Sequence, residues 1–206
     1  MTSPSASPRS IPNNNAPTGS APISTAPTGS ASISTVPPLV VMGVTSSGKS
    51  TVGMDIAATL GIPFTDGDDL HPASNKAKMA AGIPLDDTDR WPWLRVIGEY
   101  MAAELAIGQP TVVACSALKR SYRDLLREHV PSVVFVHLTG PADVIRDRML
   151  ARTHEFMPTA LLTSQLATLE PIEPNERAIL VDITATPAEI VREVQRRLPE
   201  FANPLD

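Results

Sequence analysis

Eight consecutive residues, from Gly43 to Ser50, have the composition and spacing of a phosphate-binding loop. They read Gly-Val-Thr-Ser-Ser-Gly-Lys-Ser and match the pattern G-x-x-x-x-G-K-[ST] in full. In such a loop the glycines let backbone N–H groups face the phosphates, the lysine reaches the outer phosphates, and the final hydroxyl binds Mg²⁺. We therefore expect a nucleotide site with Mg²⁺ on Ser50, formed by Gly43, Thr45, Ser46, Ser47, Gly48, Lys49, Ser50 and Thr51.

A pair of carboxylates follows the next apolar run, in the sequence Thr65-Asp66-Gly67-Asp68-Asp69. Alternate residues of an extended chain point to the same side, so Asp66 and Asp68 are expected to face one pocket. A solvated turn is the alternative for such a string, but its place beside a phosphate loop favours a site. We expect Asp66 to hold the water shell of Mg²⁺ and Asp68 to accept a hydroxyl proton.

The elements that must position these residues are short β-branched runs separated by stretches of helical periodicity. Each run is nearly continuous in apolar residues, as strands covered on both faces require. Strands alternating with helices predict an α/β fold with a five-stranded parallel sheet and helices on both faces. Ligands of such sheets bind beyond the carboxyl ends of the strands, where both motifs would lie. The predicted strands are residues 39–42, 62–65, 111–115, 133–138 and 178–183.

Several helix ends are marked by local signals. The helix after the phosphate loop is expected to end at Gly61, because glycine readily takes the left-handed conformation of a helix C-terminus. A second helix is predicted to begin at Asp89, with Pro92 tolerated in its first turn. The last helix begins with a capping box, in which Thr186 and Glu189 stand three residues apart.

The first 37 residues differ from the rest in composition. They hold one charged residue, Arg9, and a decapeptide at 16–25 that recurs at 26–35 with one change, from Pro22 to Ser32. Such a segment has too little apolar surface to offset its ordering entropy, so residues 1–37 are predicted to be a disordered tail before a single domain of ordinary size at 38–206. The Ser-rich, acid-free tail also suits a transit peptide, although one arginine is few for an amphipathic basic helix.

Charge and cysteine content narrow the class of partner. The formal charge is −5 and there is no run of Lys or Arg, which argues against nucleic acid or an anionic membrane surface as the partner. No apolar run approaches the ~20 residues that span a bilayer, and the single cysteine, Cys115, has no partner within the chain. We expect a cytoplasmic enzyme with a small-molecule substrate, and a homodimer is the assembly that we keep open.

Three further strings carry a specific resemblance. Residues 66–72 (DGDDLHP), 79–94 (MAAGIPLDDTDRWPWL) and 115–127 (CSALKRSYRDLLR) resemble the gluconokinase family in content, order and spacing. The resemblance extends from about Val40 to Asp182. It implies a P-loop kinase fold related to shikimate kinases, a mobile lid from about Asp147 to Pro158, and the transfer of phosphate from ATP to D-gluconate to give 6-phosphogluconate.

The basic residues receive their expected roles partly from this resemblance. Arg90 resembles the family's substrate-side arginine, which pairs with the gluconate carboxylate. Lys119 follows the third strand and is expected at the site by position, and Arg123, one turn into the next helix, is expected to reach the sugar acid. His71 is assigned to the substrate side, with a packing role as the equal alternative. Arg148 and Arg152 of the lid region are expected to bind the nucleotide phosphates, because a guanidinium matches phosphate oxygens.

The sequence departs from the family pattern at two places. Ser46 stands where the phosphate loop of the family often has glycine. The lid pattern resembles Arg-x-x-His-Phe, but Glu155 occupies the usual histidine position and His154 precedes it. We therefore give His154 no catalytic role and assign Arg152 the catalytic contact with the transferring phosphate.

Two other functions remain open at this point. A kinase of the same fold for another sugar acid or for a shikimate-like acceptor would keep the phosphate loop and the aspartate pair. A regulatory nucleotide-binding protein would bind ATP without turnover of an acceptor. A GTPase switch is disfavoured, since no N-K-x-D run for guanine recognition is present.

Overall fold

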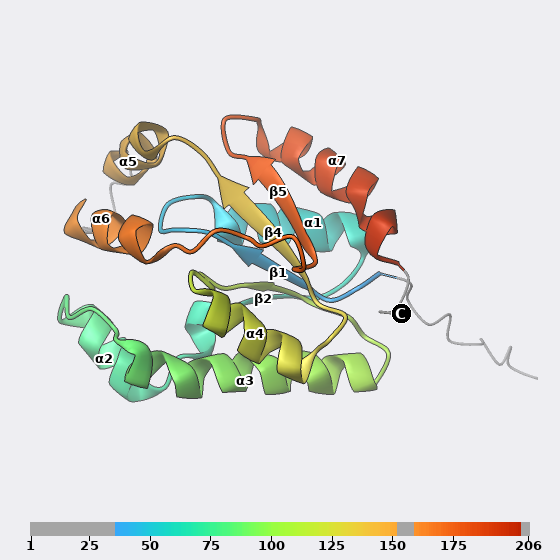
Figure 1. Ribbon diagram of the computed structural model, residues 1–206, viewed down its shortest axis with the longest axis horizontal. Helices are drawn as coiled ribbons and strands as arrows, with labels where there is room; N and C mark the ends of the chain where they lie inside the picture. Colours follow the sequence, from blue (N-terminus) through green and yellow to red (C-terminus); the bar gives the residue numbers. More distant parts are fainter. Residues whose placement is uncertain (1–35, 152–158, 203–206) are drawn as a thin grey trace, which may run out of the picture. The chain divides into compact units, whose positions relative to one another are not determined.

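Five parallel strands form one sheet in the computed structural model, which describes residues 36–151 and 159–202 (Figure 1). The spatial order is β2-β3-β1-β4-β5, so the strand that leads to the phosphate loop is central, with β3 and β4 as its neighbours. The predicted parallel α/β fold is confirmed. The strands are β1 (Leu39–Met42), β2 (Phe64–Asp66), β3 (Val112–Ala114), β4 (Val134–Thr139) and β5 (Ala178–Asp182).

The strand bounds follow the predicted apolar runs with small shifts. The first run is β1 without change, whereas β2 begins two residues later than predicted, at Phe64. Pro63 has no backbone N–H to donate to a neighbouring strand, and only its carbonyl is used, accepting the N–H of Val112 at 2.9 Å. The strand therefore starts after the proline.

Helices cover both faces of the sheet. Figure 1 shows α3 and α4 on one side and α1 and α7 on the other, while α5 and α6 lie toward the carboxyl ends of the strands. In the described residues no helix is long and apolar enough to cross a membrane. The helices are α1 (Lys49–Leu60), α2 (Ala73–Ala80), α3 (Asp87–Ala106), α4 (Arg120–His129), α5 (Ala142–Leu150), α6 (Thr159–Thr168) and α7 (Pro187–Arg197).

Alternation along each strand divides the core into two layers. Val41 of β1 faces the layer that contains Ile56 of α1 and Ile190 of α7. Val40 faces the other layer, with Leu94 of α3 and buried residues of α4. Because both faces of the central strands are buried, the sheet holds the ends of β1 and β3 in fixed register, and the site is built on those ends.

The capping signals locate two helix ends correctly and one start incorrectly. Gly61 has φ 67° at the end of α1, and Thr186 forms the predicted capping box at the start of α7. The start of α3 needs correction, because Asp86 and not a later residue is its N-cap, and Asp86 forms a capping box with Asp89. The helix therefore begins at Asp87, and Pro92 lies in its second turn.

The predicted tail lies outside the described residues, apart from its end. Val36 is half-buried and Pro37 is buried, and both line a cavity together with Leu60 of α1 and Leu198. The folded part of the chain therefore begins at least one residue before the predicted boundary at 38.

Candidate active site

The phosphate loop connects β1 to α1 and depends on both motif glycines. Gly43 has φ 144°, and a Cβ at this residue would lie 2.9 Å from the carbonyl oxygen of Leu138. Gly48 has φ 100° and is the N-cap of α1. A side chain would strain the loop at either residue, so the sequence pattern and the backbone agree.

Ser46, the residue that departs from the family pattern, takes the conformation of a glycine. Its φ is 59°, in the left-handed region that costs an L-residue about 1 kcal/mol or more. The curvature of the loop is therefore preserved without the glycine. The hydroxyls of Ser46 and Ser47 are buried and have no hydrogen-bond partner among the described residues. Two unsatisfied donors in a left-handed loop at a helix N-terminus fit the phosphate oxygens of a nucleotide.

The predicted metal pair is brought together at the start of α1. The Ser50 hydroxyl donates to Oδ2 of Asp66 at 2.6 Å, so two oxygen atoms suited to Mg²⁺ or its water shell lie side by side. Mg²⁺ is commonly held by one or two protein groups and several waters. This fits the described residues, which hold no cluster of three or more possible metal-binding His, Cys, Asp or Glu side chains. The Nζ of Lys49 donates to the carbonyl of Val44 at 3.1 Å, and Thr51 is exposed in the first turn of α1.

Arg148 of α5 lies against the phosphate loop, as predicted for a nucleotide contact. Its Nη1 is 4.0 Å from the position that a Cβ of Gly48 would occupy, and its Nη2 donates to the carbonyl of Ile183. The fixed guanidinium therefore faces the loop with one edge. The predicted contact of Arg152, and the departures at His154 and Glu155, lie outside the described residues.

The geometry expected for the aspartate pair is wrong in its premise. The extended chain ends at Asp66, and Gly67–Leu70 forms a 3-10 turn in which Oδ1 of Asp66 accepts the N–H of Asp68 at 3.1 Å. Asp66 thus caps the turn and meets Ser50, while the Asp68 side chain is 78% exposed. The indole N–H of Trp93 donates to the carbonyl of Gly67 at 2.7 Å and fixes the turn from α3.

His71 is a packed residue and does not line the acceptor cavity described below. Its ring stacks on Trp93 with centroids 4.0 Å apart, and Nδ1 lies 3.2 Å from the side-chain nitrogen of Asn75. Burial, assisted by the charges of Arg90 and Lys76, lowers its pKa to about 4, so the ring is neutral at pH 7. Its Nε2 lies 3.8 Å from Asp68. The packing alternative is therefore favoured over direct substrate contact.

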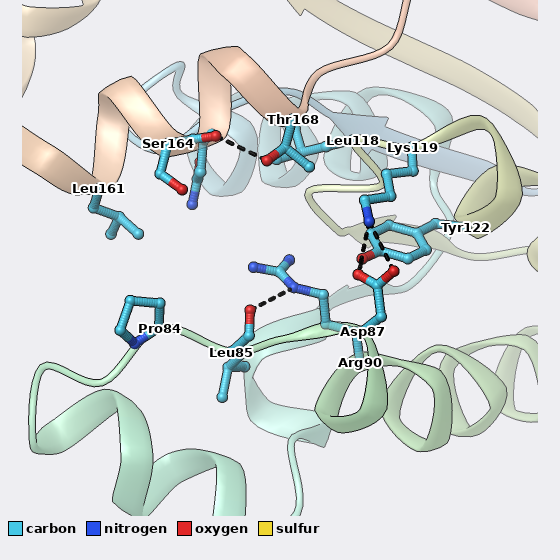
Figure 2. A pocket seen from close by; sticks show the side chains of 11 residues that line it. Pro84, Leu85, Asp87, Arg90, Leu118, Lys119, Tyr122, Leu161, Ser164 and Thr168 are labelled. Carbon is cyan, nitrogen blue, oxygen red and sulfur yellow. Dashed lines mark hydrogen bonds and ion pairs between the residues drawn. The ribbon is translucent and has the colours of Figure 1, made fainter.

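A polar cavity lies between α6 and the start of α3. Figure 2 shows the guanidinium of Arg90 directed into this space from below, opposite Ser164 of α6, with Lys119 at one side. The Nε of Arg90 donates to the carbonyl of Leu85 at 3.3 Å, which fixes the side chain and leaves its outer edge toward the cavity. Two of the predicted substrate residues therefore share one cavity.

The third charge of the cavity was not predicted. Lys119 forms an ion pair with Asp87 at 2.7 Å, and the hydroxyl of Tyr122 donates to the same carboxylate. The hydrogen bonds from Lys119 and Tyr122 hold the pKa of Asp87 below its usual range. Asp87 is thus an ionised acceptor for hydroxyl groups, next to the cations Lys119 and Arg90.

Cys115 is a buried thiol directly after β3. Burial raises its pKa to about 12, and the charges of Asp68, Lys49 and Arg90 all act on it. Cys115 itself is a protonated core residue.

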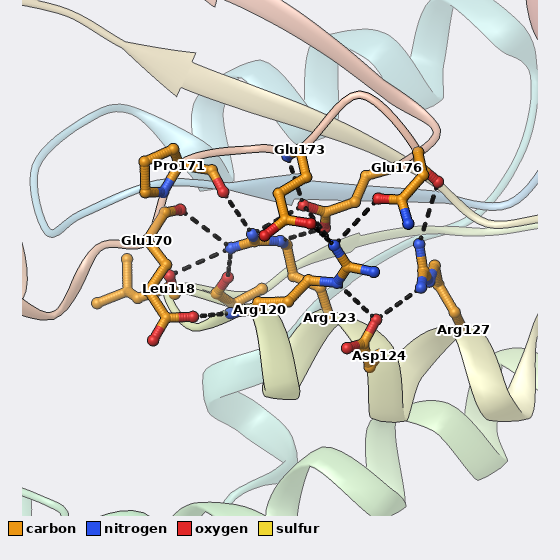
Figure 3. A network of polar contacts seen from close by, with 11 residues as sticks. Leu118, Arg120, Arg123, Asp124, Arg127, Glu170, Pro171, Glu173 and Glu176 are labelled. Atoms are coloured by element: carbon orange, nitrogen blue, oxygen red, sulfur yellow. Dashed lines mark hydrogen bonds and ion pairs between the residues drawn. The ribbon is translucent and has the colours of Figure 1, made fainter.

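The prediction that Arg123 binds the sugar acid is corrected by its burial. The side chain is fully buried and forms an ion pair with Glu176, with Nε 2.6 Å from one oxygen and Nη2 2.9 Å from the other (Figure 3). Its remaining donors bind backbone carbonyls, including those of Leu118 and Pro171. Burial acts to raise the pKa of Glu176, but the hydrogen bonds from Arg123 and from the backbone N–H of Glu173, together with the charges of Arg123 and Arg120, hold the pKa below its usual range. All donors are used within the fold.

Arg120 extends this network on the surface. It forms ion pairs with Asp124 at 2.8 Å and with Glu173 at 2.6 Å, and its backbone N–H donates to Glu170. The segment that follows α6 is therefore fastened to the start of α4, beside Lys119. Arginines 120 and 123, which recur at helical spacing, are anchors of a loop.

Two residues that line the cavity, Asp87 and Gln165, were not assigned from the sequence. The Oε1 of Gln165 accepts the N–H of Thr45 at 2.6 Å, across 120 residues of chain. Asp87 lies inside a string used for the family resemblance, but nothing in its local pattern distinguishes it from Asp86 or Asp89. Only the fold brings either residue to the site.

Comparisons with known proteins agree with this geometry. The sequence profile of the family described as Shikimate kinase matches residues 45–199. The chain is 44% identical over 172 residues to a probable gluconokinase of Xenopus tropicalis, covering 76% of this chain and 90% of that protein. It is 44% identical to the thermoresistant gluconokinase of Escherichia coli, covering 69% and 81%. A solved gluconokinase from Sinorhizobium meliloti is 51% identical, with a TM-score of 0.74 and coverage of 81% and 93%.

Proposed function

The chain belongs to the gluconokinase family, and from this premise we propose that it transfers the γ-phosphoryl group of ATP to the terminal hydroxyl of D-gluconate, giving 6-phosphogluconate and ADP. The observation that carries the proposal is the junction of a complete phosphate loop with a cavity that presents Arg90, Lys119 and Asp87. A cation pair suits the carboxylate of an aldonic acid, and an ionised carboxylate suits its hydroxyl groups.

The nucleotide half of the site consists of the loop amides and the groups around them. The N–H groups at the start of α1, the hydroxyls of Ser46 and Ser47, and the charges of Lys49 and Arg148 would receive the phosphates of ATP. Such groups act by electrostatic stabilisation of charge on the transferring phosphoryl group. Arg152 is proposed to add a further positive charge, and its sequence neighbours support this, since Arg148 lies beside Gly48 and Gln165 binds Thr45.

Ser50 and Asp66 are proposed to hold Mg²⁺, directly or through water. The ion would neutralise charge on the β- and γ-phosphates when it is bound. The chain supplies the oxygen pair at 2.6 Å and fixes Asp66 through the N–H of Asp68.

In the half of the site that binds the acceptor, Asp68 is proposed to accept the proton of the reacting terminal hydroxyl group. Its exposed carboxylate lies in the turn that directly follows Asp66 at the end of β2. Arg90 and Lys119 would bind the carboxylate at the opposite end of the sugar acid. In a loose phosphoryl-transfer transition state the gain from a base is modest, so positioning of the acceptor supplies the larger part of the rate.

The experiment that tests this function is an ADP-release assay of the full chain with gluconate, shikimate, glycerate and nucleoside monophosphates as separate acceptors. Turnover with gluconate and not with the others is expected. Activity restricted to another acid would replace the substrate, and tight ATP binding without turnover of any acceptor would favour a regulatory nucleotide-binding protein.

Location and assembly are proposed separately, and each has its own measurement. A cytoplasmic location is supported by the single buried thiol, which suits a reducing compartment, and cell fractionation tests it. A homodimer remains a prediction that sedimentation of the full chain would decide.

A further inference from the structure

Gln165 joins the two halves of the site. It is half-buried on α6 and lines the acceptor cavity with Arg90 and Lys119, while its Oε1 accepts the N–H of Thr45 in the phosphate loop at 2.6 Å. One side chain therefore contacts the loop that binds the phosphate donor and borders the cavity proposed for the acceptor.

The orientation of the side-chain amide follows from its partner. A backbone N–H can only donate, so the oxygen of the amide must face Thr45. The –NH₂ group is bonded to the same carbon of the planar amide and points in a different direction from the oxygen, so its two donors are directed away from Thr45. A donor at this border suits an acceptor rich in hydroxyl oxygens.

Backbone hydrogen bonds at the end of α6 hold Gln165 in this position. The backbone carbonyl of Gln165 accepts the N–H of Leu169 at 2.9 Å, and the N–H of Glu170 donates to the carbonyl of Leu118 at 2.8 Å. Leu118 also lines the cavity, so the end of α6 is fixed to the acceptor side. The end of α6 is thereby fastened to Leu118, in the connection before α4, and to Arg120 of α4.

We propose that Gln165 is a specificity-determining residue of the acceptor site, which donates from Nε2 to a hydroxyl oxygen of the polyhydroxy acid while its Oε1 holds Thr45. This inference rests on the proposed function. The side chain that contacts the phosphate loop would then also orient the acceptor, so the hydroxyl group and the phosphoryl group would be positioned relative to each other by one residue.

The test compares Gln165→Met and Gln165→Glu with Gln195→Met. Methionine keeps the length of the side chain and removes both polar ends, whereas glutamate keeps an acceptor for Thr45 and removes the donor. Gln195 is an exposed residue of α7 that lines the separate cavity next to Val36, so the same change there is a matched control. The measurements are the KM for gluconate, ATP binding by calorimetry without acceptor, and melting temperature.

Both Gln165 variants are expected to raise the KM for gluconate by about 10-fold or more, the size of one lost hydrogen bond that leaves a partner unsatisfied. ATP affinity should change by less than about 3-fold, and Gln195→Met should behave as the unchanged protein. With a series of monodeoxygluconates, the unchanged enzyme should discriminate against one compound, and Gln165→Met should lose that discrimination.

Opposite results overturn the inference. If Gln165 only blocks the loop, Gln165→Met will bind ATP more tightly and will keep the KM for gluconate. If it only braces the fold, the melting temperature will fall and every deoxygluconate will be affected equally. Absence of gluconate turnover in the unchanged protein would instead defeat the proposed function, so the two failures are distinguishable.

Discussion

Replacement of Arg123 by methionine separates an anchor from a substrate ligand. Methionine fills most of the space of the arginine stem and cannot form an ion pair. The substitution would leave the carboxylate of Glu176 buried, with its main partner gone, because the Glu176 side chain is fully buried in its pair with Arg123. It would also remove the donors to the carbonyls of Leu118 and Pro171.

The expected magnitude follows from the burial. Removing one partner of a buried ion pair costs about 3–5 kcal/mol, because an uncompensated charge remains. For a domain of this size, 1 kcal/mol shifts the melting temperature by about 2–4 °C, so Arg123→Met should melt about 6–20 °C lower. Part of this loss returns when Glu176 is also replaced by leucine, since the pair then becomes apolar on both sides.

Urea unfolding and the KM for gluconate together decide between the two roles. The free energy of unfolding should fall by the amount above, while the KM, measured at a temperature at which the variant is folded, should stay within about 3-fold of its original value. Arg127→Met, on the same helix and in surface contact with Asp124, is the control and should cost less than about 1 kcal/mol. Unchanged stability with a KM raised 10-fold or more would refute the structural role and restore the contact with substrate.

The remaining predictions concern the phosphate loop, the aspartates and one buried histidine. Lys49→Ala should lower turnover by about 10²-fold or more with an unchanged circular dichroism spectrum; near-normal turnover would remove the loop from the mechanism. Asp68→Asn should lower the saturated rate by about 10²-fold, the low end of the range for loss of a general base, whereas Asp66→Asn should raise the Mg²⁺ concentration for half-maximal rate, and the reverse pattern would exchange their roles. Ser46→Gly removes the strain of a positive φ and a buried unpaired hydroxyl. Without nucleotide it should raise the free energy of unfolding in urea by about 1 kcal/mol, and a lower free energy would contradict the strain. Burial, assisted by the charge of Arg123, lowers the pKa of His137 to about 4, so the unfolded chain takes up the proton first and the free energy of unfolding falls as pH drops from 6.5 to 4. Between pH 7.5 and 5, His137→Phe should lose about 2 kcal/mol less of its free energy of unfolding than the original protein. Equal losses would exclude the histidine as the cause.

Local signals in the sequence predicted those parts of the fold that depend on neighbouring residues. The capping box of Thr186 and Glu189, and the left-handed Gly61, follow from contacts within four residues and are confirmed. Asp86 and Asp89 form the same kind of box, but the two residues between them, Asp87 and Thr88, could also cap a helix and left the start of α3 ambiguous. Residues distant in sequence contact this segment, since Tyr122 donates to Asp87 and Lys78 forms an ion pair with Asp89, and the local pattern does not show these contacts.

In the candidate site, too, the features formed by neighbouring residues were predicted and the others were not. The phosphate loop is contiguous, so its pattern predicted both the glycine conformations and the meeting of Ser50 with the nearby strand end. The aspartate pair was placed correctly at the end of β2, but its shared face was inferred from an extended chain that stops at Asp66. Because a turn begins at Gly67, the alternation of an extended chain does not apply to Asp68. The segment is also too short for any periodicity to show where this side chain points.

Arg123 shows why a charged residue at helical spacing can be misassigned. Its position one turn into α4 is compatible with the site, with solvent, or with the interior, and the burial of an arginine is paid for only if a carboxylate meets it. That carboxylate, Glu176, is 53 residues away and follows α6. The sequence therefore contained both partners without indicating that they were a pair.

The cavity proposed for the acceptor, in contrast to the contiguous phosphate loop, is lined by separated segments of the chain. The cavity takes Pro84 to Arg90 from the start of α3, Leu118 to Tyr122 from the start of α4, and Leu161 to Thr168 from α6. Each segment reaches the site because parallel strands deliver their connections to the same edge of the sheet. A kinase with the same phosphate loop could therefore accept another acid by changes in these three segments alone. Among them, α6 also contacts the phosphate loop through Gln165, so a change there would alter the alignment of donor and acceptor together.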